Sequence, residues 1–142
     1  MNGFLLDTNV PSETVRPVPD PRVTAWIEAQ PLESLFISVV SFGEWHKGIT
    51  LLPASKRRTE LQEWMETRVI KLFSGRILPM TQRIAERWGV LEGERQRMGR
   101  PFHVPDAQIA ATALEHGLTL VTRNVADFEH LGLSILNPWE AR

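Results

Sequence analysis

Four acidic side chains could together perform metal-assisted chemistry. Each lies near the end of a short apolar run or in the first turns of the helix expected after one: Asp7, Glu44, Asp106 and Asp127. Carboxylate oxygens are hard ligands of the kind that Mg²⁺ and Mn²⁺ take. Carboxylates that converge repel one another, and this repulsion falls when a cation lies among them. The pattern therefore favours a divalent-metal site, provided that the fold brings the four acids together.

Each acid also has a purely structural explanation. Asp7 suits a turn, because short polar side chains bond their own backbone. The dipole of a helix favours an acid such as Asp106 in the first turn, and Asp127 could cap a short turn. Glu44 could lie solvated on the flank of a helix. These explanations are the more common ones for single residues, but they do not account for acids gathering at one edge of a sheet.

The elements that must position these acids alternate between strands and helices. Apolar runs predict strands at 4–6, from 35 onward, and at 76–79, 118–122 and 133–136. Apolar spacing and capping residues predict helices from Asp20 to Pro31, at 41–52 and 55–74, from Thr81 to Gly99, and at 104–117. This alternation predicts an α/β fold with a parallel sheet covered on both faces. With right-handed crossovers, the segments that carry the acids share one edge of that sheet.

The overall composition narrows the possible classes of protein. At 142 residues the chain has the length of one domain, and 16 Lys plus Arg against 17 Asp plus Glu leave a net charge of −1. No global charge therefore attracts nucleic acid. The lack of cysteine excludes disulfides, thiolate zinc sites and cysteine nucleophiles. Without a basic leader or an apolar run near the roughly 18 residues of a membrane-spanning helix, we expect a cytoplasmic protein with no membrane partner.

Other catalytic chemistries find little support in the sequence. No G-x-S-x-G occurs, the four histidines show no paired spacing, and no glycine loop could hold a phosphate. A phosphatase with an aspartyl nucleophile generally carries a second acid two residues after the first, where this chain has Asn9.

Four segments in a fixed order carry a resemblance to a known family. They are "LLDTNV", "EWHKG", "PDAQIAATA" and "LVTRNVADF", and they extend over most of the chain. In this order they resemble PIN-domain proteins and, more narrowly, VapC-type toxins, the ribonuclease half of bacterial toxin–antitoxin pairs. The closing "LNPW" resembles a subgroup whose antitoxin also contacts operator DNA.

The resemblance implies a fold, an activity and a set of site residues. We expect a single PIN-like domain over residues 1–142, a three-layer α/β/α structure around a mainly parallel sheet. The activity it implies is hydrolysis of RNA with Mg²⁺ or Mn²⁺, leaving 5′-phosphate and 3′-hydroxyl ends. The acids of the family fall on Asp7, Glu44 and Asp106. Either Asp127 or Asn124 fills its fourth position, and we favour Asp127 as a catalytic and metal-binding acid. The supporting residues implied are Thr8, Asn9, Thr122 and Asn124.

The resemblance also implies partners. We expect an RNA substrate, a cognate antitoxin, a homodimer, and operator DNA bound only through the antitoxin. Because four acids repel RNA, its phosphates need cations elsewhere. Two basic runs could supply them or could simply be solvated helix faces: 56–58, and Arg95 with Arg97 and Arg100. Of the tryptophans, most are expected in the core, and Trp45 at the rim of the site.

One alternative function belongs to another class. The chain could act as a protein-binding partner with weak catalysis, a co-repressor in an antitoxin–DNA complex. A decayed nuclease should have lost one of the first three acids, and Asp7, Glu44 and Asp106 are all present. The sequence therefore favours the ribonuclease.

Overall fold

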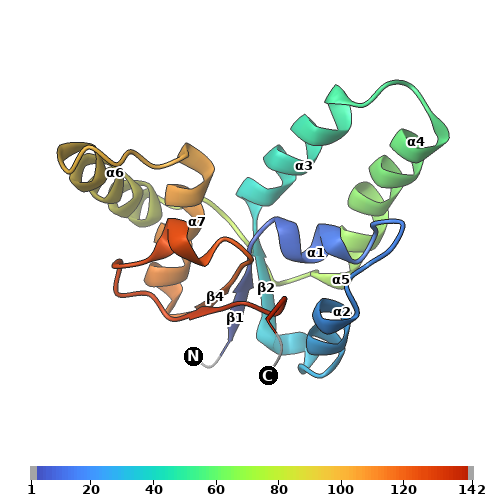
Figure 1. Cartoon of the computed structure of the whole chain (residues 1–142), viewed down its shortest axis with the longest axis horizontal. Coiled ribbons are helices and arrows are strands. Elements are labelled where there is room, and N and C mark those ends of the chain that lie inside the picture. Colours follow the sequence, from blue (N-terminus) through green and yellow to red (C-terminus); the bar gives the residue numbers. More distant parts are fainter. Residues whose placement is uncertain (1–2, 141–142) are drawn as a thin grey trace.

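The fold is a five-stranded parallel sheet with helices on both faces, described by a computed structural model for residues 3–140 (Figure 1). The strands are β1 (Phe4–Leu6), β2 (Leu35–Ser38), β3 (Ile77–Leu78), β4 (Thr119–Val121) and β5 (Ile135–Leu136). Their order across the sheet is β3-β2-β1-β4-β5, and every neighbouring pair is parallel. The prediction of a three-layer α/β/α fold is confirmed.

The helices lie in two groups on either side of the sheet. The α-helices are α1 (Asn9–Glu13), α2 (Pro21–Glu28), α3 (Val39–Leu51), α4 (Lys56–Glu63), α5 (Ile70–Leu72), α6 (Gln82–Arg97) and α7 (Val104–His116). Shorter helical turns are η1 (Leu32–Ser34) and η3 (Val125–Phe128), and η2 (Trp64–Val69) is a π-helix. Figure 1 shows α6 and α7 on one side of the sheet, and α1, α2, α4 and α5 on the other.

Strand β1 divides the hydrophobic core into two halves. Successive side chains of a strand point to opposite faces, so Leu6 packs in the cluster that includes Val10, Val23 and Trp64, whereas Leu5 packs against Ile109 on α7. Both leucines are almost completely buried. The β1 backbone is therefore held from both faces, which makes the residue at its carboxyl end a rigid support for chemistry.

Local capping explains most of the predicted helix boundaries. The side chain of Asp20 accepts a hydrogen bond from the N–H of Arg22, and Thr81 accepts one from Ile84, so that α2 and α6 start where capping predicts. Helix α7 ends at Gly117, whose φ of 64° is one that glycine adopts readily. No helix in residues 3–140 is both long and apolar enough to cross a membrane.

Two predicted helices differ clearly from the structure, and the strands near 77, 119 and 135 are shorter than predicted. Helix α3 begins at Val39 rather than 41, because Ser38 ends β2 and its side chain caps the helix by accepting the N–H of Val40. The helix predicted over 55–74 is divided into α4, the π-helical η2 and α5. The apolar spacing in this segment reports which face is buried, and it does not distinguish α-helical from π-helical turns.

Candidate active site

The candidate site lies where the direction of winding of the sheet reverses. The chain runs from β1 outward through β2 to β3, and later returns to β4 on the other side of β1. Ligands of open α/β sheets bind beyond the carboxyl ends of the strands at such a reversal. Asp7 follows β1 and Thr122 follows β4, and these strands pair Leu6 with Val121. The N–H of Asp7 also donates to the carbonyl of Val121 at 2.9 Å, which fixes the two ends together.

Asp7 is a buried carboxylate held by two neutral donors. Only 4% of the residue is exposed. Its Oδ1 accepts the backbone N–H of Thr8 at 2.8 Å, and its Oδ2 accepts the hydroxyl of Thr122 at 2.7 Å. Burial raises the pKa of Asp7; the bonds from Thr122 and Thr8 lower it, and the charges of Glu44 and Asp127 raise it again. Within residues 3–140 no basic side chain forms an ion pair with Asp7, so an external cation would relieve this charge.

Thr8 connects the end of β1 to helix α3. Its Oγ1 donates to Oε1 of Glu44 at 2.5 Å and lies 2.9 Å from the hydroxyl oxygen of Ser41. Because the single hydroxyl proton of Thr8 goes to Glu44, Ser41 is the donor in the second bond. The indole Nε1 of Trp45 donates to the carbonyl of Thr8 at 3.1 Å. These contacts orient the carboxylate of Glu44 toward the end of β1.

Thr122 holds the end of β4 in the same way. It is completely buried, and its hydroxyl accepts the backbone N–H of Asn124 at 3.0 Å while donating to Asp7. The carbonyl of Asn124 accepts the N–H of Asp127 at 3.1 Å, which begins the turn η3. The side chains of Asn124 and Asp127 are both exposed. Asn124 thus helps to form the turn that carries Asp127.

Asp106 completes the group from the first turn of α7. Burial and the charge of Asp7 raise its pKa to about 6; His103 opposes the shift, and the charges of Asp127 and Glu44 add to it. The Nδ1 of His103 lies 3.9 Å from Oδ2 of Asp106. The helix is firmly anchored, because Ile109, Ala110 and Ala113 on the face of Asp106 are fully buried.

The four acids therefore share one electrostatic neighbourhood, as the sequence predicts. The charges of Asp7, Glu44 and Asp127 all act on Asp106, and those of Glu44 and Asp127 act on Asp7. In the described part of the chain, however, no three His, Cys, Asp or Glu side chains are close enough to form a ready-made metal cage. This arrangement suits Mg²⁺ or Mn²⁺ bound by one or two carboxylates, since Mg²⁺ keeps several of its water ligands.

The raised pKa of Asp106 predicts a pH-dependent stability. Between about pH 4 and pH 6 the folded, metal-free chain holds a proton on Asp106 that the unfolded chain has lost. The free energy of unfolding should therefore fall as pH rises through this range. Asp106→Asn should reduce this fall, whereas Glu63→Gln, an exposed site on α4, should leave it unchanged. Urea unfolding at pH 4, 5, 6 and 7 in EDTA measures the effect, and equal slopes in the two variants would contradict it.

Comparison with known proteins agrees with this geometry. The family described as PIN domain matches residues 4–132. The chain belongs to the PIN-domain family. It is 40% identical over 137 residues to VapC ribonuclease Y4jK of Sinorhizobium fredii, covering 96% of this chain and 98% of that protein. It is 37% identical to the toxin FitB of Neisseria gonorrhoeae over 136 residues, 96% of this chain and 98% of that one.

A solved structure supports the assignment of this chain to the PIN-domain family. The structure described as FitAB bound to an IR36 DNA fragment superposes with a TM-score of 0.88 and 36% identity, covering 98% of this chain and 97% of that chain. Within the PIN-domain family, this chain thus belongs to the group that includes the VapC and FitB proteins of toxin–antitoxin systems.

The structure adds residues to this PIN domain that sequence reasoning missed. Ser41 contacts Thr8 from the face of α3 that also carries Glu44 and Trp45, and the spacing of three and four residues was the available signal. The prediction that Trp45 lies at the rim was wrong. Trp45 is 6% exposed and lies in the core, where its indole N–H donates a hydrogen bond to the carbonyl of Thr8 and so fixes the connection between β1 and α1.

Asn9 differs from the role that the resemblance implies. Its Oδ1 is buried and has no hydrogen-bond partner among the described residues. The loop after β1 is held instead by Thr8, whose carbonyl accepts both Trp45 and the hydroxyl of Ser12, the latter at 3.0 Å. Asn9 therefore places an unpaired oxygen acceptor two residues after Asp7.

Proposed function

We propose that this PIN domain, as one unit over residues 1–142, is a metal-dependent endoribonuclease, the toxin of a toxin–antitoxin pair. The observation that carries the proposal is the buried carboxylate of Asp7, which has a raised pKa, no basic partner within residues 3–140, and three further acids acting on the same space. An oxygen-only donor set of this kind fits Mg²⁺ or Mn²⁺ better than softer metals.

The roles of the residues follow from their contacts. A bound Mg²⁺ or Mn²⁺ would supply an activated water and offset charge on the scissile phosphate. Asp7 and Asp106 would hold it, because they come from the rigidly packed β1 and α7. Thr8 and Thr122 fix the two oxygens of Asp7, and Thr8 also orients Glu44. Exposed Asp127 faces the entering RNA and would bind the ion through water or hold a second one.

Removal of the metal tests this proposal. Purified chain, free of antitoxin, should cut a mixed RNA pool with Mg²⁺ or Mn²⁺, and EDTA should stop the cutting. The fragments should carry 5′-phosphate ends, which ligation of an adapter to untreated products detects. Cleavage that persists in EDTA, or fragments with 5′-hydroxyl ends, would contradict the mechanism.

The partners are part of the same proposal. Toxin–antitoxin membership supports an antitoxin that binds this chain, and the DNA-bound FitAB structure supports operator contact through that antitoxin. We further propose that the chain forms a homodimer and that RNA is its substrate. A role as a catalytically weak co-repressor is not favoured, since the four acids remain present and electrostatically coupled.

A further inference from the structure

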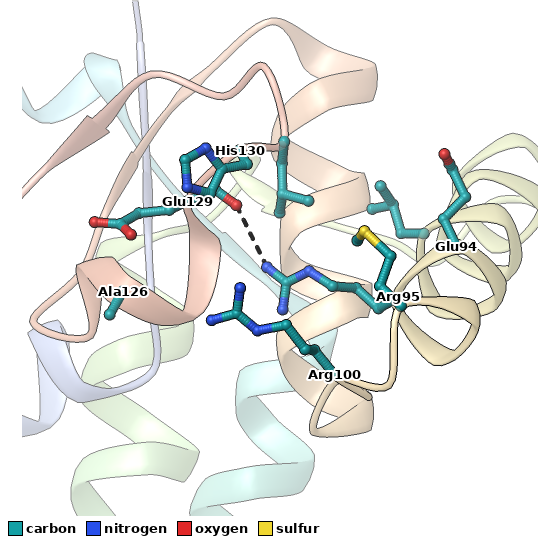
Figure 2. A pocket seen from close by; sticks show the side chains of 9 residues that line it. Glu94, Arg95, Arg100, Ala126, Glu129 and His130 are labelled. Carbon is teal, nitrogen blue, oxygen red and sulfur yellow. Dashed lines mark hydrogen bonds between the residues drawn. The ribbon is translucent and has the colours of Figure 1, made fainter.

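A pocket of about 370 Å³ lies between the end of α6 and the turn η3, which carries Asp127 (Figure 2). Arg95 and Arg100 line it on one side, and Ala126, Glu129 and His130 line it on the other. Ala126 is the neighbour of Asp127, so the pocket and the candidate active site share the wall formed by η3. The pocket lining includes two arginines, Arg95 and Arg100, although the adjacent site is acidic.

The turn after α6 places the two arginines together. Helix α6 ends at Arg97, and Gly99 has a φ of 72°, which favours glycine. The chain then folds back, and the N–H of Arg100 donates to the carbonyl of Arg95 at 3.0 Å. Both arginines line the same pocket, and Figure 2 shows their guanidinium groups directed toward η3. The segment "RQRMGR" (95–100) thus places the positive charges of its first and last residues on one wall of the pocket.

Arg95 is held in a fixed orientation. Its guanidinium carbon lies 4.1 Å from the centre of the Phe102 ring. Its Nη2 donates to the carbonyl of Asp127 at 3.2 Å and to that of Glu129 at 3.4 Å. Its Nε and Nη1 donate to no acceptor within residues 3–140. A planar group fixed in this way keeps donors available for a ligand with little further loss of entropy.

Stabilisation of the end of helix α6 does not explain why an arginine stands at position 100. A helix dipole favours Arg95 and Arg97 in the last turn of α6, but Arg100 lies beyond the helix end. Among residues 3–140 neither Arg95 nor Arg100 forms an ion pair. The pocket also contains Glu94 and Glu129, whose carboxyl groups point away from the pair in Figure 2. Two guanidinium groups that line one pocket without a carboxylate partner can both donate hydrogen bonds to the oxygens of a phosphate.

We propose that Arg95 and Arg100 form a phosphate subsite, which binds the RNA backbone next to the phosphate that is cut. The inference rests on the proposed function, because it places an RNA strand at the acids. Arg95 contacts the backbone of Asp127, so a strand whose scissile phosphate lies at the acids brings a flanking phosphate to this wall. The subsite supplies the attraction for RNA that the acids oppose.

The test compares Arg100→Gln with Arg97→Gln, an exposed arginine of the same basic run that does not line the pocket. Binding of a short fluorescein-labelled single-stranded RNA is measured by anisotropy in EDTA at several salt concentrations. Arg100→Gln should weaken binding about 3- to 10-fold and reduce the salt slope by about 0.7, the value for one lost phosphate contact in a single strand. In cleavage assays it should raise KM more than it lowers kcat.

Three outcomes separate the two proposals. RNA that is bound and cut equally well by both variants would overturn the subsite and leave the nuclease standing. The same holds if Arg100→Gln weakens capture of the antitoxin but not of RNA, since the pair would then bind an acidic protein segment. A wild-type chain that neither binds nor cuts RNA would overturn both. Because Arg97 and Arg100 are both exposed and neither side chain forms a hydrogen bond within residues 3–140, both variants should retain the wild-type melting temperature.

Discussion

Asp7→Asn should abolish RNA cleavage while leaving the fold intact. The substitution keeps the shape of the side chain but removes the charge that would hold a cation. Loss of a residue that only supports a metal ligand lowers activity by about 10- to 100-fold, so loss of the ligand itself should lower kcat by at least about 100-fold. Thermal stability at neutral pH should stay the same or rise. Burial raises the pKa of Asp7, so the folded chain carries a penalty for ionisation above that pKa, and asparagine removes it.

Asp20→Asn provides the matched control for this experiment. Asp20 caps α2 outside the candidate site, and asparagine caps helices about as well as aspartate. The control should therefore cleave RNA at the wild-type rate. Initial rates with Mg²⁺ and melting curves in EDTA measure both properties. Wild-type cleavage by Asp7→Asn would contradict the assignment of Asp7, and a loss shared by Asp20→Asn would indicate a folding defect instead.

Thr122→Val should have the second largest effect, on both stability and activity. The hydroxyl of Thr122 donates to Asp7 and accepts the N–H of Asn124, and the residue is completely buried. Valine fills the same space but leaves these groups without a partner, which should cost about 1–3 kcal/mol in the free energy of unfolding. Cleavage should fall about 10- to 100-fold, because Asp7 loses the donor that orients it.

The same substitution should change the pH dependence of cleavage. The bond from Thr122 lowers the pKa of Asp7, so its loss raises that pKa further, and the acid limb of the rate profile should move to higher pH. Thr122→Ser keeps the hydroxyl and should retain the wild-type profile, at a cost of about 0.8 kcal/mol for the buried methyl group. Urea unfolding and rates across pH 5 to 9 separate the two variants. Identical profiles would show that the hydroxyl has no role.

Much of the architecture was determined by the sequence alone. Short continuous apolar runs predicted the strands and helical spacing of apolar residues predicted the helices, because strands of a parallel sheet are buried on both faces and these helices on one. Capping residues such as Asp20 and Thr81, and glycines such as Gly117, set helix ends through local hydrogen bonds and backbone freedom. The alternation predicts that the segments with Asp7, Glu44, Asp106 and Asp127 share one sheet edge, and in the structure the charges of these acids act on one another.

Other features were decided only by the tertiary structure. The raised pKa values of Asp7 and Asp106 depend on burial and on charges from distant segments, which no local pattern specifies. Ser41 and Trp45 contact Thr8 although they lie 33 and 37 positions after it in the sequence. Arg95 and Arg100 form one pocket wall only because the backbone reverses at Gly99. Such contacts form when helices and strands pack against one another, so the local pattern of any one segment does not predict them.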